Sequence, residues 1–138
     1  ALMVPSFGPT LVNGVATYWW ELFKAVPLLD VAYVPVGLGS GACAAIAAKL
    51  ALGHRARIVG VVSTGATTYA QSIQAGHVVP SPVTTVLADG MAVRVADADA
   101  LALTFAETVS RLDTATSRRI NRMRGETAMS EYDIFSDV

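Results

Sequence analysis

Residues 31–53 read VAYVPVGLGSGACAAIAAKLALG, and this stretch decides the fold. Its first part, Val31 to Val36, is rich in β-branched side chains and predicts a buried parallel strand. The glycine-rich segment Gly37 to Gly41 follows at once. The alanine-rich run Ala42 to Leu52 then predicts a helix that ends at Gly53. A strand that passes through a glycine-rich turn into a helix is the first half of a strand–helix–strand unit.

The same alternation continues toward the C-terminus. Residues 57–62 form a second apolar, β-branched run, and residues 66–75 predict another helix, closed by Gly76. Strands that alternate with helices at this spacing pack as a parallel sheet with right-handed connections. The predicted fold class is therefore α/β, a short open parallel sheet with flanking helices, Rossmann-like in architecture.

Outside this unit the pattern is less regular. We expect a short strand at residues 2–4, a helix from Thr10 or Asn13 to about Val26, and a loop with a short strand around residues 88–90. The helix is apolar nearly all round, which predicts burial on several sides. A helical pattern returns at Asp97, and residues 130–138 are acidic and expected to be frayed. We therefore divide the chain into an α/β part, residues 1–96, and a helical C-terminal extension, residues 97–138.

The amino-acid composition of the chain limits the kinds of partner that it is expected to bind. Of the 138 residues, 53% are hydrophobic and 15% are charged, so we expect large buried surfaces and a homo-oligomer. A net charge of −1 argues against nucleic acid and acidic membrane surfaces as partners, and no apolar run reaches the roughly 18 residues of a membrane span. The single cysteine, Cys43, excludes an internal disulfide and fits a cytoplasmic location.

The glycine-rich segment is the candidate binding site. A helix N-terminus carries unpaired N–H groups and a positive dipole end, and both favour an anion. Glycines let the backbone approach a phosphate closely, and the hydroxyl of Ser40 adds a donor. We therefore expect a phosphate or sulfate at Gly37 to Gly41; a turn that needs glycine only for its geometry is the alternative. A dinucleotide site is disfavoured because the next strand ends in Ser63 and Thr64, without the carboxylate that would hold a ribose.

Several stretches, in one order, resemble a known family. Pro35 to Gly41 resembles the tetraglycine phosphate loop of the threonine/serine dehydratases, which are pyridoxal-phosphate (PLP) enzymes of the tryptophan-synthase-β-like fold, fold type II. The further stretches that match the family are Val12-Asn13-Gly14-Val15-Ala16-Thr17, Val26-Pro27-Leu28-Leu29-Asp30, Ala75-Gly76-His77 and Leu87-Ala88-Asp89-Gly90-Met91. The resemblance covers about residues 2–95.

This resemblance implies PLP as the cofactor, held through its phosphate. The cofactor-binding residues would be Gly37, Leu38, Gly39, Ser40, Gly41 and Gly90. The last of these would lie near the face of the pyridine ring. The lysine that binds the cofactor in the family lies upstream of the matching stretches, and neither Lys24 nor Lys49 stands in such a motif, so covalent attachment is not expected. Lys49 is expected on the outer face of its helix. The acidic residues that bind a metal in some relatives have no counterpart here, so no metal site carries over.

The implied activity is that of a lyase, an amino-acid dehydratase that releases a 2-oxo acid and ammonia. This chain would be a fragment or derivative of such an enzyme, without the catalytic-lysine part. Two alternatives stay open. Ser40 could be the nucleophile of an esterase-like hydrolase with His54 or His77 as its base. A non-catalytic anion-binding or assembly module would need no reactive group. Cys43 is expected to be a small buried core residue.

Overall fold

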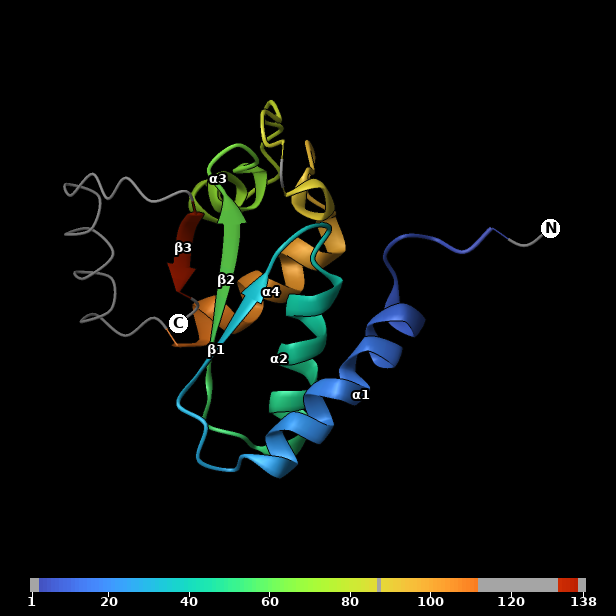
Figure 1. Ribbon diagram of the computed structural model, residues 1–138, viewed down its shortest axis with the longest axis vertical. Coiled ribbons are helices and arrows are strands. Elements are labelled where there is room, and N and C mark those ends of the chain that lie inside the picture. Colours follow the sequence, from blue (N-terminus) through green and yellow to red (C-terminus); the bar gives the residue numbers. More distant parts are fainter. Residues whose placement is uncertain (1–2, 87, 112–131, 137–138) are drawn as a thin grey trace.

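The computed structural model describes residues 3–86, 88–111 and 132–136 (Figure 1). Its helices are α1 (Pro9–Ala25), α2 (Ser40–Leu52), α3 (Thr68–Ala75) and α4 (Ala98–Arg111), with one 3₁₀ turn, η1 (Asp89–Met91). Its strands are β1 (Val31–Pro35), β2 (Arg57–Ser63) and β3 (Tyr132–Ser136). The predicted alternation is thus confirmed as β1–α2–β2–α3, and the fold class is α/β.

The sheet has the order β1-β2-β3. β1 and β2 are parallel, as the sequence predicts, with Val31 opposite Arg57 and Pro35 opposite Val61. β3 pairs with the other edge of β2 in the antiparallel direction. This third strand is not predicted from the sequence pattern, and it lies in the residues that were expected to be frayed. Its physical role is plain, because the backbone groups on that edge of β2 need hydrogen-bond partners and β3 supplies them.

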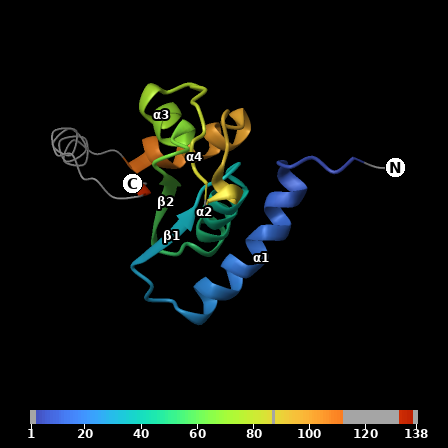
Figure 2. The same ribbon diagram turned by 45° about the horizontal axis from the view of Figure 1, so that its top comes forward.

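Helix α2 is the centre of the packing (Figures 1 and 2). It contacts α1, both parallel strands and α4. Its small residues explain this position: Ala44 and Ala45 are fully buried, and short side chains let neighbouring elements approach closely. On the α1 side, Trp19 and Phe23 fill the space between the helices, with ring centroids 5.7 Å apart.

Helix α1 packs on one side only, which corrects the expectation that it is buried on several sides. Trp19 and Phe23 are buried, whereas Tyr18 is 50% exposed and Trp20 is 42% exposed. Leu28, just after the helix, is 89% exposed. The apolar residues of α1 thus exceed what α2 covers, and an apolar face remains on the surface of the chain.

Two predicted short strands are wrong. Residues 3–4 have no regular structure, and η1 occupies residues 89–91. The Asp-Gly pair in η1 favours turns, and this local preference decides the conformation there. Helix α4 lies beyond residue 96 and packs against α2 and α3. The division of the chain at that residue remains a prediction.

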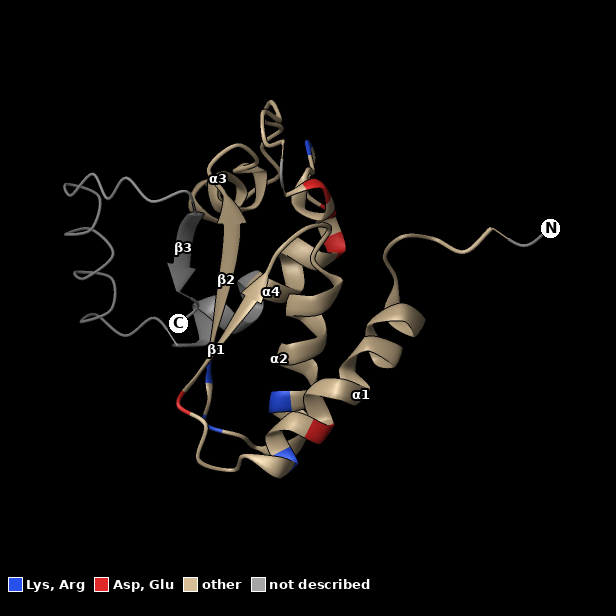
Figure 3. Ribbon diagram, in the orientation of Figure 1, with Lys and Arg blue, Asp and Glu red and all other residues tan. Residues whose placement is uncertain are grey.

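Among the residues that Figure 3 colours, the charged ones gather at two ends of the described fold. One group lies where α1 ends and β1 begins, and the other lies around η1 and the start of α4. The middle of α1 and most of α2 are without charge. Within the described ranges, none of the helices combines the length and hydropathy needed to cross a membrane.

Candidate functional site

The glycine-rich segment joins β1 to α2 at the carboxyl end of the strand. Strand pairing continues to Val36, whose N–H donates to the carbonyl of Val61 at 2.8 Å. Gly39 is the N-cap of α2, and Cys43 N–H donates the first helical hydrogen bond to its carbonyl at 3.0 Å. The N–H groups of residues 40 and 41 precede that bond, so the described part of the chain gives them no partner. They occupy the position from which a helix binds an anion.

Two of the glycines are required by packing. A side chain at Gly37 would collide with the carbonyl oxygen of Gly90. Gly39 has a φ of +103°, which L side chains rarely adopt. A Cβ there would lie 2.8 Å from the hydroxyl of Tyr69 and 2.9 Å from the Cβ of Ala100. At these two positions, glycine serves the geometry of the turn.

Gly41 is different, because packing does not explain it. A Cβ at this position would make only ordinary contacts, 3.7 Å to Val34 and 4.0 Å to Tyr18. The residue lies in the first turn of α2 and is partly exposed. A glycine here leaves the helix N-terminus open to an anion. The backbone donors here and the hydroxyl of Ser40 are chemically suited to a phosphate group.

The structure brings Gly90 to the glycine-rich segment from far along the chain. Its carbonyl lies against Gly37, so η1 borders the loop. Gly90 itself is exposed, and a Cβ there would meet nothing within 4 Å. Its backbone is thus available beside the loop, and its closeness to a bound ring remains a prediction. Asp89 is exposed in the same turn.

Tyr69 holds the glycine-rich segment through a hydrogen bond from its hydroxyl group. Its hydroxyl donates to the carbonyl of Leu38 at 2.5 Å and accepts a hydrogen bond from Asp97 N–H at 3.2 Å. The Asp97 carboxylate caps α4, accepting from Asp99 N–H and Ala100 N–H at 3.0 Å each. Neither role was predicted from the sequence. An aspartate before a helical pattern is a recognisable N-cap, whereas no local pattern singles out Tyr69.

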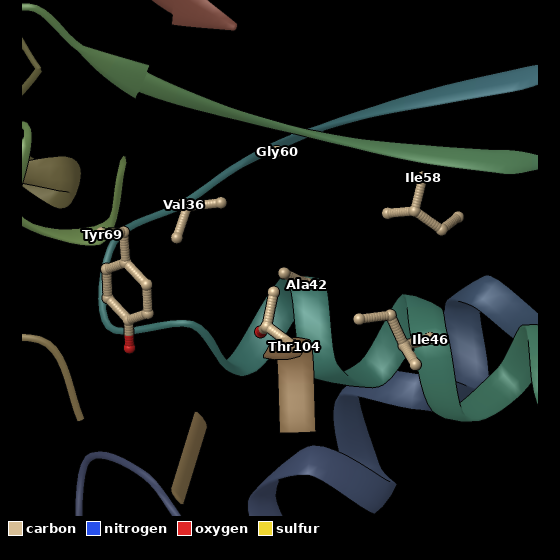
Figure 4. A pocket seen from close by; sticks show the side chains of 7 residues that line it. All are labelled: Val36, Ala42, Ile46, Ile58, Gly60, Tyr69 and Thr104. Atoms are coloured by element: carbon tan, nitrogen blue, oxygen red, sulfur yellow. The ribbon is translucent and has the colours of Figure 1, made fainter. Parts of the chain in front are cut away.

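A small apolar void lies behind the loop (Figure 4). The residues that line it are Val36, Ala42, Ile46, Ile58, Gly60, Tyr69 and Thr104. It has room for about one water molecule. Figure 4 shows the Tyr69 ring beside Val36 with its hydroxyl turned away from the strands. This apolar space suits no anion, so the candidate site is the open N-terminus of α2 and not the void.

None of the hydrogen bonds found among the described residues joins a histidine to Ser40. His54 follows the opposite end of α2, roughly 20 Å away at about 1.5 Å per residue. Its ring stacks on Phe23 with centroids 4.6 Å apart, and its two nitrogens bond to backbone atoms of Val26 and Ala56. His77 follows the C-terminal end of α3, whereas the N-terminal turn of that helix contacts the loop. The described hydrogen bonds of both histidines thus go to backbone atoms, and the hydrolase alternative remains a prediction.

Cys43 and Lys49 lie deeper in α2. Cys43 is fully buried, as expected, and its Sγ lies 3.6 Å from the carbonyl of Ala100. Burial raises the pKa of this thiol to about 11, so it stays protonated and unreactive near neutral pH. Lys49 is only 1% exposed, so its expected place on the outer face is wrong. Among the described residues, no three His, Cys, Asp or Glu side chains are grouped for a metal ion, and the absence of a metal stays a prediction.

Comparison with known proteins places the chain in a family. The family described as "Pyridoxal-phosphate dependent enzyme" matches residues 1–131, which extends beyond the resemblance seen in the sequence. The L-threonine ammonia-lyase of Geobacter sulfurreducens is 38% identical over 96 residues, which are 68% of this chain and 24% of that protein.

Two solved structures share the fold. The processed form of threonine deaminase isoform 2 from Solanum lycopersicum matches with a TM-score of 0.70 and 24% identity, over 74% of this chain and 30% of that one. Maize serine racemase matches with a TM-score of 0.64 and 28% identity, over 72% of this chain and 32% of that one. The chain thus spans about a quarter to a third of the length of these relatives. It belongs to the family of pyridoxal-phosphate dependent enzymes and is similar to their threonine and serine dehydratase members.

Proposed function

We propose that the chain is the phosphate-binding part of a PLP-dependent amino-acid dehydratase, an ammonia-lyase. The observation that carries the proposal is the open start of α2, where Gly41 is not required by packing and the first N–H groups await an acceptor. The phosphate of PLP would be held by backbone N–H groups of residues 37–41 and by the hydroxyl of Ser40. The same donors suit inorganic phosphate or sulfate.

The residues of this chain would bind and orient the cofactor. PLP, when bound, supplies the electron sink that lets an amino acid lose its α-proton and its β-hydroxyl group. The N–H groups at the start of α2 would fix the phosphate end, and Gly90 would border the ring. By holding the phosphate end, these residues would limit the orientations that the cofactor can take toward the rest of the enzyme.

We propose that residues 1–138 do not attach the cofactor covalently. Lys24 lies in the last turn of α1, and Lys49 lies nine residues after Ser40, roughly 14 Å along α2 at about 1.5 Å per residue. Neither position suits an amine that must reach a ring anchored at the start of α2. Lyase chemistry would then need a lysine from another part of the enzyme. A non-catalytic anion-binding module would use the same loop and would differ only in never associating with a lysine-bearing part of an enzyme.

A homo-oligomer, most simply a two-fold dimer, is part of this proposal. Tyr18 and Leu22 are exposed along one border of the buried stripe of α1 and Trp20 along the other, and exposed apolar side chains of this kind commonly mark an interface. The net charge of −1 gives no attraction for nucleic acid. A cytoplasmic location is also proposed, and the support for it is a lone, buried, unpaired cysteine.

Titration calorimetry with PLP, inorganic phosphate and pyridoxal tests the site. We expect PLP and phosphate to compete with each other, and pyridoxal, which lacks the phosphate, to bind far more weakly. Gly41→Asp should weaken phosphate binding at least about fivefold, because like charges a few Å apart repel by more than about 1 kcal/mol. The fold should survive, since a carboxylate stabilises a helix N-terminus.

Gly14→Asp, on the exposed side of α1, is the matched control because a side chain at Gly14 would meet nothing within 4 Å. It should leave phosphate binding unchanged. Equal affinities for PLP and pyridoxal would contradict the proposal, as would full phosphate binding by Gly41→Asp.

A further inference from the structure

Tyr69 links three elements of the fold at one oxygen atom. The residue belongs to the first turn of α3 and is 2% exposed. Its hydroxyl donates to the Leu38 carbonyl in the loop after β1, and it accepts from Asp97 N–H at the start of α4. The same hydroxyl occupies the space that a side chain at residue 39 would need. The backbone of the loop is therefore held against a buried ring.

The bond to Leu38 sets the direction of the next N–H group. In a trans peptide, the carbonyl of one residue and the N–H of the next point to opposite sides, and no cis peptide is found in the described residues. A Leu38 carbonyl held toward Tyr69 thus turns the N–H of Gly39 away from the ring. Because Gly39 tolerates several backbone conformations, nothing in its own geometry would hold this peptide in one orientation.

We propose that Tyr69 is a positioning residue of the anion site: its hydroxyl holds the Leu38 peptide so that the N–H of Gly39 joins those of Ser40 and Gly41 in binding a phosphate group. This inference rests on the proposed function and extends it to a residue that never touches the ligand. The ligand class is a phosphate monoester or inorganic phosphate.

The chemistry of the hydroxyl suits this role. Burial raises the pKa of Tyr69, against a smaller opposing effect of the hydrogen bond from Asp97 N–H. The hydroxyl therefore keeps its proton and remains a donor to Leu38 near neutral pH. Asp97 holds the start of α4 through Asp99 N–H and Ala100 N–H, so the acceptor side of the hydroxyl is tied to a capped helix.

Tyr69→Phe tests the proposal, with Thr68→Val as its matched control. Both residues lie in the first turn of α3, both are buried, and both changes remove one hydroxyl. The Thr68 hydroxyl donates to the carbonyl of Val79 at 2.8 Å, a residue outside the segment Gly37 to Gly41. Each protein is titrated with inorganic phosphate by calorimetry, and its amide signals are recorded by NMR with and without phosphate.

We expect Tyr69→Phe to raise the dissociation constant for phosphate at least about tenfold, as for one lost oriented hydrogen bond to a charged group. The Gly39 amide signal should move in the ligand-free Tyr69→Phe protein and stay in place in Thr68→Val, whose affinity should equal that of the wild type. Wild-type affinity in Tyr69→Phe would overturn the positioning role and leave the proposed function standing. Equal losses in both variants would also overturn it, because they would indicate a general effect on the fold.

A wild-type chain that binds no phosphate would overturn the proposed function and this inference together. Hydrogen exchange in the wild type provides a test that needs no variant, in case Tyr69→Phe does not fold. Phosphate should slow the exchange of the Gly39 N–H together with those of Ser40 and Gly41. Protection of residues 40 and 41 without protection of Gly39 would refute the inference alone.

Discussion

Gly39→Ala should destabilise the fold strongly for a change of one methyl group. Two costs add at this position. The backbone φ of +103° is costly for any residue with a Cβ, by about 1–2 kcal/mol. The new Cβ would also lie 2.8 Å from the Tyr69 hydroxyl and 2.9 Å from the Ala100 Cβ, and overpacking of this kind costs about 1–3 kcal/mol. We expect the free energy of unfolding to fall by about 2–5 kcal/mol.

Substitutions at two other glycines distinguish the cost of the positive φ from the cost of steric overlap. Gly53 also has a positive φ, +60°, but a Cβ there would meet nothing within 4 Å, so Gly53→Ala should cost only the backbone part, about 1 kcal/mol. Gly14 lies inside α1 with open space around it, and Gly14→Ala should stabilise the helix by about 0.5–1 kcal/mol.

Urea unfolding followed by tryptophan fluorescence measures all three variants, since Trp19 lies buried between α1 and α2. The order of stability should be Gly14→Ala, wild type, Gly53→Ala, Gly39→Ala. A Gly39→Ala protein as stable as Gly53→Ala would refute the reasoning, because it would mean that Tyr69 and Ala100 do not constrain the loop. The same variant should also lose phosphate affinity, since its Cβ displaces the Tyr69 hydroxyl.

Three further predictions concern the thiol, the assembly and the chemistry. Burial raises the pKa of Cys43 from 9.0 to about 11, so the folded chain holds this proton more tightly than the unfolded chain. Stability should therefore fall as pH rises from 9 to 11, and Cys43→Ala should flatten part of that fall in urea titrations; superimposable pH curves would contradict it. In sedimentation runs the chain should behave as a dimer that Trp20→Lys weakens, and a wild-type chain that stays monomeric at high micromolar concentration would exclude the assembly. In a 2-oxo acid assay the chain alone should release nothing from serine or threonine, with or without PLP. Release that disappears in Lys49→Ala would show that the lysines are wrongly placed.

The elements around the glycine-rich segment could be predicted because their signals are local. β-branched runs define β1 and β2, alanines define α2, and glycines close α2 and α3. The position of Gly37 to Gly41 between a strand and a helix follows from the same pattern. The anion-binding role of that segment rests on a general property of helix ends and on the family resemblance.

The features that were missed depend on contacts between distant residues. The link from Tyr69 to Leu38 spans 31 residues, and nothing in the sequence near either residue indicates it. The buried place of Lys49 and the exposed face of α1 are likewise set by which neighbours are present, and the apolar pattern of a helix does not say how many sides are covered. The pairing of β3 with β2 depends on an open strand edge, which a local pattern cannot show.

The order β1-β2-β3 leaves β1 at an edge of the sheet that the structure describes, and Pro35 is the last residue of that strand. Proline has no N–H to offer, so an incoming strand would lose one of its hydrogen bonds there. Without it, the segment Val31 to Val36 would hold valine and tyrosine at all positions but Ala32, and apolar segments of this kind stack into cross-β aggregates. Pro35 therefore disfavours the addition of a further strand at the end of β1 that leads into the phosphate loop. We expect a Pro35→Val chain to keep its binding loop and to aggregate more readily.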